Sequence, residues 1–217
     1  MVRDLDALYL NFISGFEMCL GTAQALRHGF AGPIFTDLHS LFLGMREDGI
    51  RTLQPLSNAA EWLGCFDVVQ CNEEELAQLD HDSMAVAATA MAAGVSALIV
   101  TLGPRGAVYF CEEGVDASAF APVGATRASP QRALASRPRA LAPSRPLKTA
   151  LVPAPSVEVL DPTGCGDVFG AALAARLVAG SPLVGAIEAA NAAAARSAGF
   201  RGATGLARHL RGELLAL

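Results

Sequence analysis

Short apolar runs alternate with longer segments of helical character along this chain. The apolar runs, which predict strands, cover residues 7–13, 33–37, 66–71, 95–103 and 107–113. The helix-like segments cover 16–29, 57–64, 72–79, 84–94, 167–180 and a last stretch from Ser181-Pro182 to about Ser197. Strands that alternate with helices of this length indicate βαβ units. The pattern therefore predicts an α/β fold with a mostly parallel sheet flanked by helices.

One region departs from this alternation. Residues 117–157 contain no acidic residue, hold six of the sixteen basic residues, and are rich in Pro, Ala and Arg without a usable period. This composition predicts a flexible or loosely ordered insertion, placed at 121–150, in a loop between two strands. A basic segment that contacts nucleic acid is the alternative, but the absence of interleaved aromatic residues disfavours it.

Composition limits the class of protein. With 217 residues, 52% hydrophobic and 17% charged, the chain is expected to form one folded domain over 1–217. The net charge of −5 argues against a general nucleic-acid binder, which usually presents a basic face. The odd number of cysteines, without a CxxC pair, indicates reduced thiols in a cytoplasmic protein, and the four histidines show no metal-ligand spacing.

One uncharged segment, residues 83–103, is long enough to be weighed as a membrane span. It is mostly Ala with Ser, Thr and Gly, and Gly94 interrupts it before VSALIVTLG. An Ala-rich helix followed by a buried strand explains it better. No signal peptide is visible at the start, because Arg3, Asp4 and Asp6 interrupt any apolar run, so no membrane partner is expected.

The strongest chemical signal is EVLDPTGCGDVFGAA at residues 158–172. Asp161-Pro162 ends an extended segment, because the residue before proline avoids the helical region. Gly164 and Gly166 would let an anion approach bare amides at the positive end of the following helix. Asp167 in the first turn would then be a general base beside a transferring phosphoryl group. A Gly-rich turn followed by an acid favoured at a helix start explains the same residues without function.

Two other phosphate-binding motifs fit less well. The P-loop requires Gly-Lys-Ser/Thr, but the only lysine, Lys148, lies away from any Gly-rich turn, which excludes that class. A dinucleotide fingerprint reads G-x-G-x-x-G, whereas here Phe169 stands in the place of the third glycine, which is displaced to Gly170. An NAD-linked oxidoreductase is therefore the most distant alternative.

The stretch DPTGCGDVFGAALAARLVAG resembles the signature D-T-x-G-A-G-D-x-F of the ribokinase-like, or PfkB, carbohydrate kinase family, with Pro162 in place of Thr and Cys165 in place of Ala. Three further stretches are similar to family motifs in the same order. They are NEEE (72–75) for N-x-x-E, TLGPRG (101–106) for T-L-G-x-x-G, and NAAAARSAGFRGA (191–203) for the adenine-side helix. The resemblance covers most of the chain and implies a ribokinase-like, Rossmann-like three-layer fold.

The resemblance also implies an activity, which is ATP-dependent phosphotransfer to a hydroxymethyl group of a sugar or related small molecule. Asp167 would be the catalytic base of this reaction. Gly164, Cys165 and Gly166 would supply the amides of the anion hole.

The other motifs would hold ATP and its ions. Asn72 and Glu75 would position Mg²⁺ and the ATP phosphates, with the metal held through water at Glu75, which suits a cation that keeps several waters. The remaining implied roles are Thr101, Gly103 and Gly106 against the nucleotide, Asn191 near the adenine, and Asp161 as a ligand of a monovalent cation such as K⁺.

Each of these assignments has a simpler explanation. Asn72 with Glu75 is also a helix capping box. TLGPRG can be a hairpin turn only, and Asn191 can be an interhelical polar residue. Polar residues at strand ends either face a ligand or make local turn contacts, and these are Asn11, Ser14 and Asp37.

The resemblance begins after the family's first elements. The strand with a sugar-binding aspartate, the Gly-Gly motif and the β lid are not recognisable, so the chain is expected to be an N-terminally truncated member lacking the N-terminal strands and lid. Those parts supply most substrate contacts and exclude water, so the substrate cannot be predicted. A strand edge would be left open, which leaves a homo-oligomer as an open alternative.

Two functions follow for testing. One is a cytoplasmic carbohydrate kinase that uses ATP and Mg²⁺, with K⁺ as a further candidate ion, on a sugar or nucleoside-like substrate. The other is a catalytically incomplete nucleotide-binding fragment without phosphotransfer. Neither involves nucleic acid or a membrane.

Overall fold

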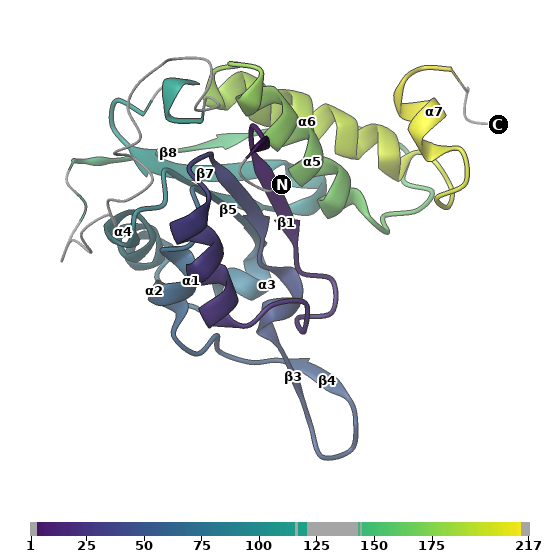
Figure 1. The fold of residues 1–217 in the computed structure, drawn as a ribbon. Helices are drawn as coiled ribbons and strands as arrows, with labels where there is room; N and C mark the ends of the chain where they lie inside the picture. The colour runs from purple at the N-terminus through teal and green to yellow at the C-terminus, as the bar shows by residue number, and fades with distance from the viewer. Residues whose placement is uncertain (1–3, 116, 121–142, 144, 214–217) are drawn as a thin grey trace.

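The computed structural model describes residues 4–115, 117–120, 143 and 145–213. Its main sheet has six strands in the order β1-β2-β5-β6-β7-β8 (Figure 1). The first four strands pair in parallel, and β7 and β8 add antiparallel at one edge. The bounds are β1 Leu8–Asn11, β2 Ile34–Asp37, β5 Val68–Asn72, β6 Ala97–Thr101, β7 Ala107–Glu112 and β8 Leu147–Val152. The predicted α/β class with a mostly parallel sheet is confirmed.

Helices cover both faces of this sheet, as Figure 1 shows. On one face lie α1 Leu20–Gly29, α2 Ala59–Leu63 and α4 Ser83–Ala93. On the other lie α5 Cys165–Val178 and α6 Leu183–Ala198, which pack against each other. The shorter helical turns are α3 Glu73–Leu76, α7 Leu206–Leu210, η2 His39–Phe42, η3 Gly103–Arg105 and η4 Ala117–Phe120.

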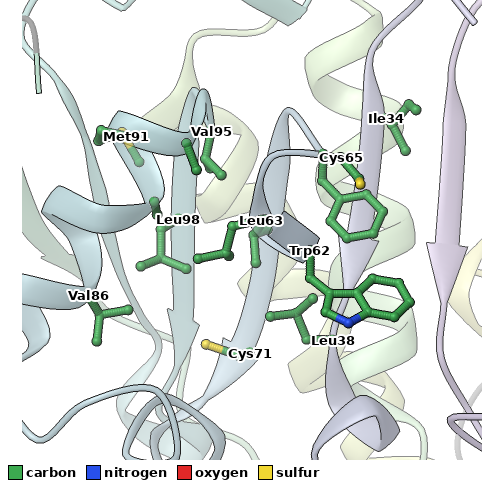
Figure 2. Packing of buried hydrophobic residues seen from close by; sticks show 14 of the residues in the cluster. Ile34, Leu38, Trp62, Leu63, Cys65, Cys71, Val86, Met91, Val95 and Leu98 are labelled. Carbon is green, nitrogen blue, oxygen red and sulfur yellow. The ribbon is translucent and has the colours of Figure 1, made fainter. Parts of the chain in front are cut away.

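Each face of the sheet has its own hydrophobic core. Figure 2 shows part of the first, in which Leu63 of α2, Val86 of α4 and Leu98 of β6 point toward one another. Trp62 packs edge-on against Phe12 in the same core, with 5.8 Å between ring centroids. The second core joins strand residues to Phe169, Leu173 and Leu177 of α5 and to Ile187 of α6. Because α5 is anchored along its apolar face, its N-terminus is held at one edge of the sheet.

The uncharged segment 83–103 forms a helix and a strand, as predicted. Asp82 caps α4 by accepting hydrogen bonds from the amides of Met84 and Ala85, at 2.9 and 3.3 Å. Gly94 then ends the helix with a φ of +106°, which glycine adopts without strain. Within the described residues, no helix combines the length and apolar character that crossing a membrane requires.

Other predicted boundaries and elements need correction. The helix predicted from residue 16 begins at Leu20, because Ser14 and Glu17 close a local turn through the Ser14 amide. The sequence analysis missed a hairpin of β3 Leu43–Met45 and β4 Arg51–Leu53, whose strands are too short to show alternation. This hairpin projects from the body of the molecule (Figure 1).

The prediction of a flexible or loosely ordered insertion at 121–150 is wrong for its last residues. Residues 121–142 and 144 lie outside the described residues. From Leu147 onward the chain is not irregular but forms β8, which pairs with β7 over its full length. Four of its six side chains are exposed, as on a sheet edge, so the strand carries almost no hydrophobic pattern.

Candidate functional site

Polar residues gather where the four parallel strands end. In the sheet register Asn11 of β1 pairs with Asp37 of β2, and Asp37 pairs with Gln70 of β5. Asn72 at the end of β5 pairs with Thr101 at the end of β6. The carboxyl ends of parallel strands are where open α/β sheets bind ligands. The fold therefore places these side chains at the expected edge.

The Gly-rich motif crosses this same edge as the start of α5. Gly164 is the N-cap and has a φ of +78°, a left-handed conformation that glycine adopts readily. The Cys165 amide donates to the Pro162 carbonyl at 3.3 Å. Among the described residues, the amides of Gly164 and Gly166 have no such acceptor. Two amides at the positive end of a 14-residue helix are thus available to an anion.

Asp167 lies beside those amides, in the first turn of α5. Its side chain is exposed, and its Oδ1 accepts a hydrogen bond of 2.7 Å from Asn11 Nδ2. A Cβ on Gly164 would lie 3.7 Å from Asp167 Oδ2, so the carboxylate leans over the turn. The structure thus brings together Asp167 and Gly164, as the motif predicted, and adds Asn11 as the partner of the carboxylate.

Behind the turn lies a buried side chain that sequence reasoning missed. Gln70 is 3% exposed, and its Nε2 donates to Asp37 Oδ2 at 2.6 Å and to the Gly166 carbonyl at 3.1 Å. Gln70 therefore joins two strands to the first turn of α5. A polar residue within the otherwise apolar run VVQC was the available signal in the sequence.

Asp37 carries an unusual carboxyl group. Its burial, and secondarily the negative charge of Glu75, raise its pKa to about 7. Its Oδ1 also accepts a hydrogen bond from the His39 amide at 3.1 Å. Burial likewise raises the pKa of the Tyr9 phenol, with Asp37 and Asp167 adding to the effect. Several acidic groups thus share a small region at the strand ends.

His39 connects this region to the N-x-x-E motif. Its Nδ1 lies 2.9 Å from Glu75 Oε1, and this contact raises the pKa of the imidazole. Glu75 is buried, and its Oε2 accepts a hydrogen bond from the Asn72 amide at 2.8 Å. In return Asn72 Oδ1 accepts from the Glu75 amide at 2.9 Å, which completes a capping box at α3. Asn72 and Glu75 therefore form the helix capping box, which is the simpler explanation of this motif.

The N-x-x-E and T-L-G-x-x-G motifs are linked directly. The guanidinium of Arg105 forms an ion pair with Glu73, which joins the turn at 103–106 to α3. Thr101 Oγ1 contacts the Cys71 carbonyl at 3.4 Å. Gly103 and Gly106 both have positive φ, at +57° and +103°. The two motifs therefore lie side by side at the sheet edge.

Asn191 is buried and makes protein contacts. Its Nδ2 donates to the carbonyls of Val152 at 2.9 Å and Pro153 at 3.4 Å. The same Val152 carbonyl would lie 2.1 Å from a Cβ on Gly106, so only glycine fits there. The T-L-G-x-x-G turn and the helix of Asn191 thus meet at the end of β8.

Asp161 ties the Gly-rich motif to the loop after α6. Its Oδ1 accepts from the Thr163 amide at 3.0 Å and its Oδ2 from the Gly202 amide at 3.1 Å. These hydrogen bonds, that of Thr163 first, lower the pKa of the carboxyl group. In the part of the chain that the structure describes, no three His, Cys, Asp or Glu residues are arranged to hold a metal ion.

Comparison with known proteins agrees with this geometry. Residues 144–208 match the model of the pfkB family carbohydrate kinases. No curated protein matches the chain by sequence. Solved structures with a similar fold include ribokinase from Thermotoga maritima (TM-score 0.64, 20% identity) and Arabidopsis thaliana ribokinase complexed with ribose and ATP (0.60, 22%). Burkholderia thailandensis nucleoside kinase in complex with inosine is also similar (0.59, 19%). The predicted resemblance is confirmed.

The alignment covers nearly all of this chain but not all of those proteins. It spans 98%, 97% and 92% of the present chain, in the same order, and 57%, 57% and 51% of the solved chains. The chain thus spans little more than half the length of the proteins whose fold it shares.

Proposed function

We propose, on the premise that this chain combines the PfkB carbohydrate kinase signature with a ribokinase-like fold, that it supplies the nucleotide-binding and catalytic part of an ATP-dependent small-molecule kinase. One observation carries the proposal. The carboxylate of Asp167, held by Asn11, leans over a helix N-terminus at which the amides of Gly164 and Gly166 have no acceptor among the described residues. This arrangement combines a base with an anion hole.

The reaction follows from that geometry. Asp167 accepts the proton of an acceptor hydroxyl while its oxygen attacks the γ-phosphorus of ATP, and the bond from that phosphorus to the bridging oxygen breaks to release ADP. Negative charge on the phosphoryl oxygens is met by the amides at Gly164 and Gly166 and by the dipole of α5. Because α5 is fixed by its buried face, these donors need no reorganisation during transfer.

The nucleotide is proposed to lie against Gly103, Gly106 and the N-terminal part of the 191–203 segment. The convergence of Gly106 and Asn191 on the Val152 carbonyl supports this, since it places the two motifs in one location. Asn191 holds the wall of the nucleotide site in place, because its side-chain amide already donates a hydrogen bond to the Val152 carbonyl. Thr101, the last residue of β6, leads into the turn at 103–106 and is proposed to line the nucleotide site with it.

The residues present fit Mg²⁺ only if water molecules lie between the metal ion and the protein side chains. Both oxygens of Glu75 already accept protein hydrogen bonds, but each retains a lone pair, which suits a cation that keeps its own waters. When bound, Mg²⁺ would neutralise charge on the ATP phosphates. For K⁺, Asp161 would be the carboxylate ligand, with the loop at Gly202 already bound to it.

The acceptor is proposed to be a sugar or nucleoside with a primary hydroxyl group. The similar solved proteins are described with ribose and with inosine, which are such molecules. Because the chain spans 57% of the ribokinase lengths, a second candidate is nucleotide binding without transfer. An NAD-linked enzyme is not favoured, because Phe169 is buried in the core where the dinucleotide fingerprint has its glycine.

Two measurements on the same protein separate these candidates. Calorimetry with Mg·ATP, with NADH as a control ligand, tests the nucleotide site. A panel of pentoses, hexoses and nucleosides, assayed for ADP and phosphorylated product, tests transfer. Binding with product supports the kinase, binding without product on any acceptor supports the second candidate, and no ATP binding rejects both.

A further inference from the structure

We infer that Gln70 is a positioning residue, which holds the anion-binding turn of α5 in register with the strand ends and so sets the affinity of that turn for phosphate. The inference rests on the phosphate role proposed for the turn. It assigns a function to a buried residue that lies outside all four sequence motifs.

The first ground is the contact pattern. The Nε2 group of Gln70 has two hydrogens, and it donates to Asp37 Oδ2 and to the Gly166 carbonyl. These acceptors belong to β2 and α5, while Gln70 lies in β5. One amide group therefore fixes the distance between the sheet and the residue that directly precedes Asp167.

The second ground is the close approach of the helix. A Cβ on Gly170 would lie 2.1 Å from Tyr9 Oη and 2.7 Å from Gln70 Oε1. Only glycine lets α5 lie this near to the side chains of β1 and β5. Gly170, the glycine displaced by one position from the dinucleotide pattern, thus allows the start of α5 to pack closely against Gln70.

The third ground is the free-energy cost of burying polar atoms that have no hydrogen-bond partner. Gln70 Oε1, Tyr9 Oη and Asn11 Oδ1 are buried without a hydrogen-bond partner in the described part of the molecule. Such groups cost stability, and a purely structural contact would favour an apolar side chain at Gln70. What offsets this cost is the pair of acceptors that the Gln70 amide holds, Asp37 and Gly166.

The test compares two Gln→Met variants in the full chain. Gln70→Met removes the contacts with Asp37 and Gly166, whereas the control Gln24→Met removes a longer, part-buried amide-to-carboxylate contact of 3.4 Å with Glu61 on the opposite face. Each variant is measured ligand-free by hydrogen exchange over residues 164–170, and then by calorimetry with Mg²⁺ and the non-hydrolysable ATP analogue AMP-PNP, which keeps the γ-phosphate. Exchange over α4 reports global stability in the same samples.

Gln70→Met is expected to speed exchange in the first turn of α5 more than in α4 and to weaken Mg·AMP-PNP binding about fivefold, as for the loss of one hydrogen bond. Gln24→Met should change neither. If Gln70→Met is too unstable to fold because Asp37 Oδ2 loses its hydrogen-bond donor, Asp37→Asn/Gln70→Met is compared with Asp37→Asn instead.

The outcomes separate the inference from the proposed function. Unchanged exchange at 164–170, or unchanged Mg·AMP-PNP affinity with faster exchange, overturns the inference while the kinase proposal stands. If the wild-type chain binds no Mg·AMP-PNP, the proposed phosphate role fails, and so does the affinity half of the inference. Faster exchange would then still establish Gln70 as a holder of the turn.

Discussion

The amide nitrogen of Asn11 lies 2.7 Å from a carboxylate oxygen of Asp167, although 156 residues separate them in the chain. The contact joins the end of the first strand of the sheet to the first turn of α5. It holds the carboxylate beside the amides of Gly164 and Gly166, which have no acceptor in the part of the chain that the structure describes. A strand end and a helix start thereby form the site at which we propose proton transfer next to a phosphoryl group.

The Asn11 contact predicts a selective loss of turnover. Asn11→Ala should lower kcat about ten- to a hundredfold, because a misplaced catalytic group costs about that much, and should leave the affinity for Mg·ATP within about twofold of wild type. Steady-state kinetics and calorimetry on the same preparation measure the two effects. An equal change in kcat and nucleotide affinity would mean that Asn11 supports the whole site and does not orient Asp167 in particular.

Gly170 should be intolerant of a single added methyl group. Gly170→Ala places its Cβ against Tyr9 and Gln70 and should destabilise the protein by about 1–3 kcal/mol, as overpacking does. Gly185 in α6 provides the matched control, since a Cβ there meets nothing within 4 Å, and Gly185→Ala should be neutral or stabilising by up to about 1 kcal/mol. Urea denaturation gives both values. Equal effects would show that the approach at Gly170 is not tight.

Asp37 predicts a pH dependence of stability. In the folded protein its carboxyl keeps a proton up to a pKa of about 7, whereas in the unfolded chain it loses the proton near 3.8. Between these values the unfolded state binds fewer protons, so the free energy of unfolding falls as pH rises toward 7 and then levels.

The check is the difference between wild type and Asp37→Asn, which removes the titrating group. From pH 5 to 8, wild type should lose about 2 to 3 kcal/mol relative to the variant. Urea denaturation at several pH values measures this. A constant difference across that range would show that Asp37 is already ionised in the folded protein at pH 5.

Asn72 allows its two assigned roles to be separated. Serine is also a strong N-cap residue, so Asn72→Ser should preserve stability to within about 0.5 kcal/mol, whereas Asn72→Ala should lose about 1 kcal/mol. If Asn72 also positions the ATP phosphates, both variants should bind Mg·ATP more weakly. Thermal unfolding and calorimetry give the two quantities, and wild-type affinity in Asn72→Ser would reduce the residue to a cap.

Motif order and periodicity predicted much of this architecture, because central parallel strands are apolar on both faces and long helices repeat regularly. The hairpin at 43–53 and the edge strand at 147–152 were not predicted, because short or exposed strands bury too few side chains to produce a hydrophobic pattern in the sequence. Asp167 and the glycines could be proposed as site residues from sequence because one local turn holds them. Gln70 and His39 were missed because their partners are distant in the chain and meet only through the sheet register.

The measurement that tests the account most directly is turnover and Mg·ATP affinity of Asp167→Asn in the longest form of the protein that phosphorylates an acceptor. The asparagine keeps the size of the side chain and removes the base. The account predicts loss of detectable phosphotransfer with nucleotide affinity within about twofold of wild type. Turnover equal to that of wild type would contradict the assignment of Asp167 as the catalytic base.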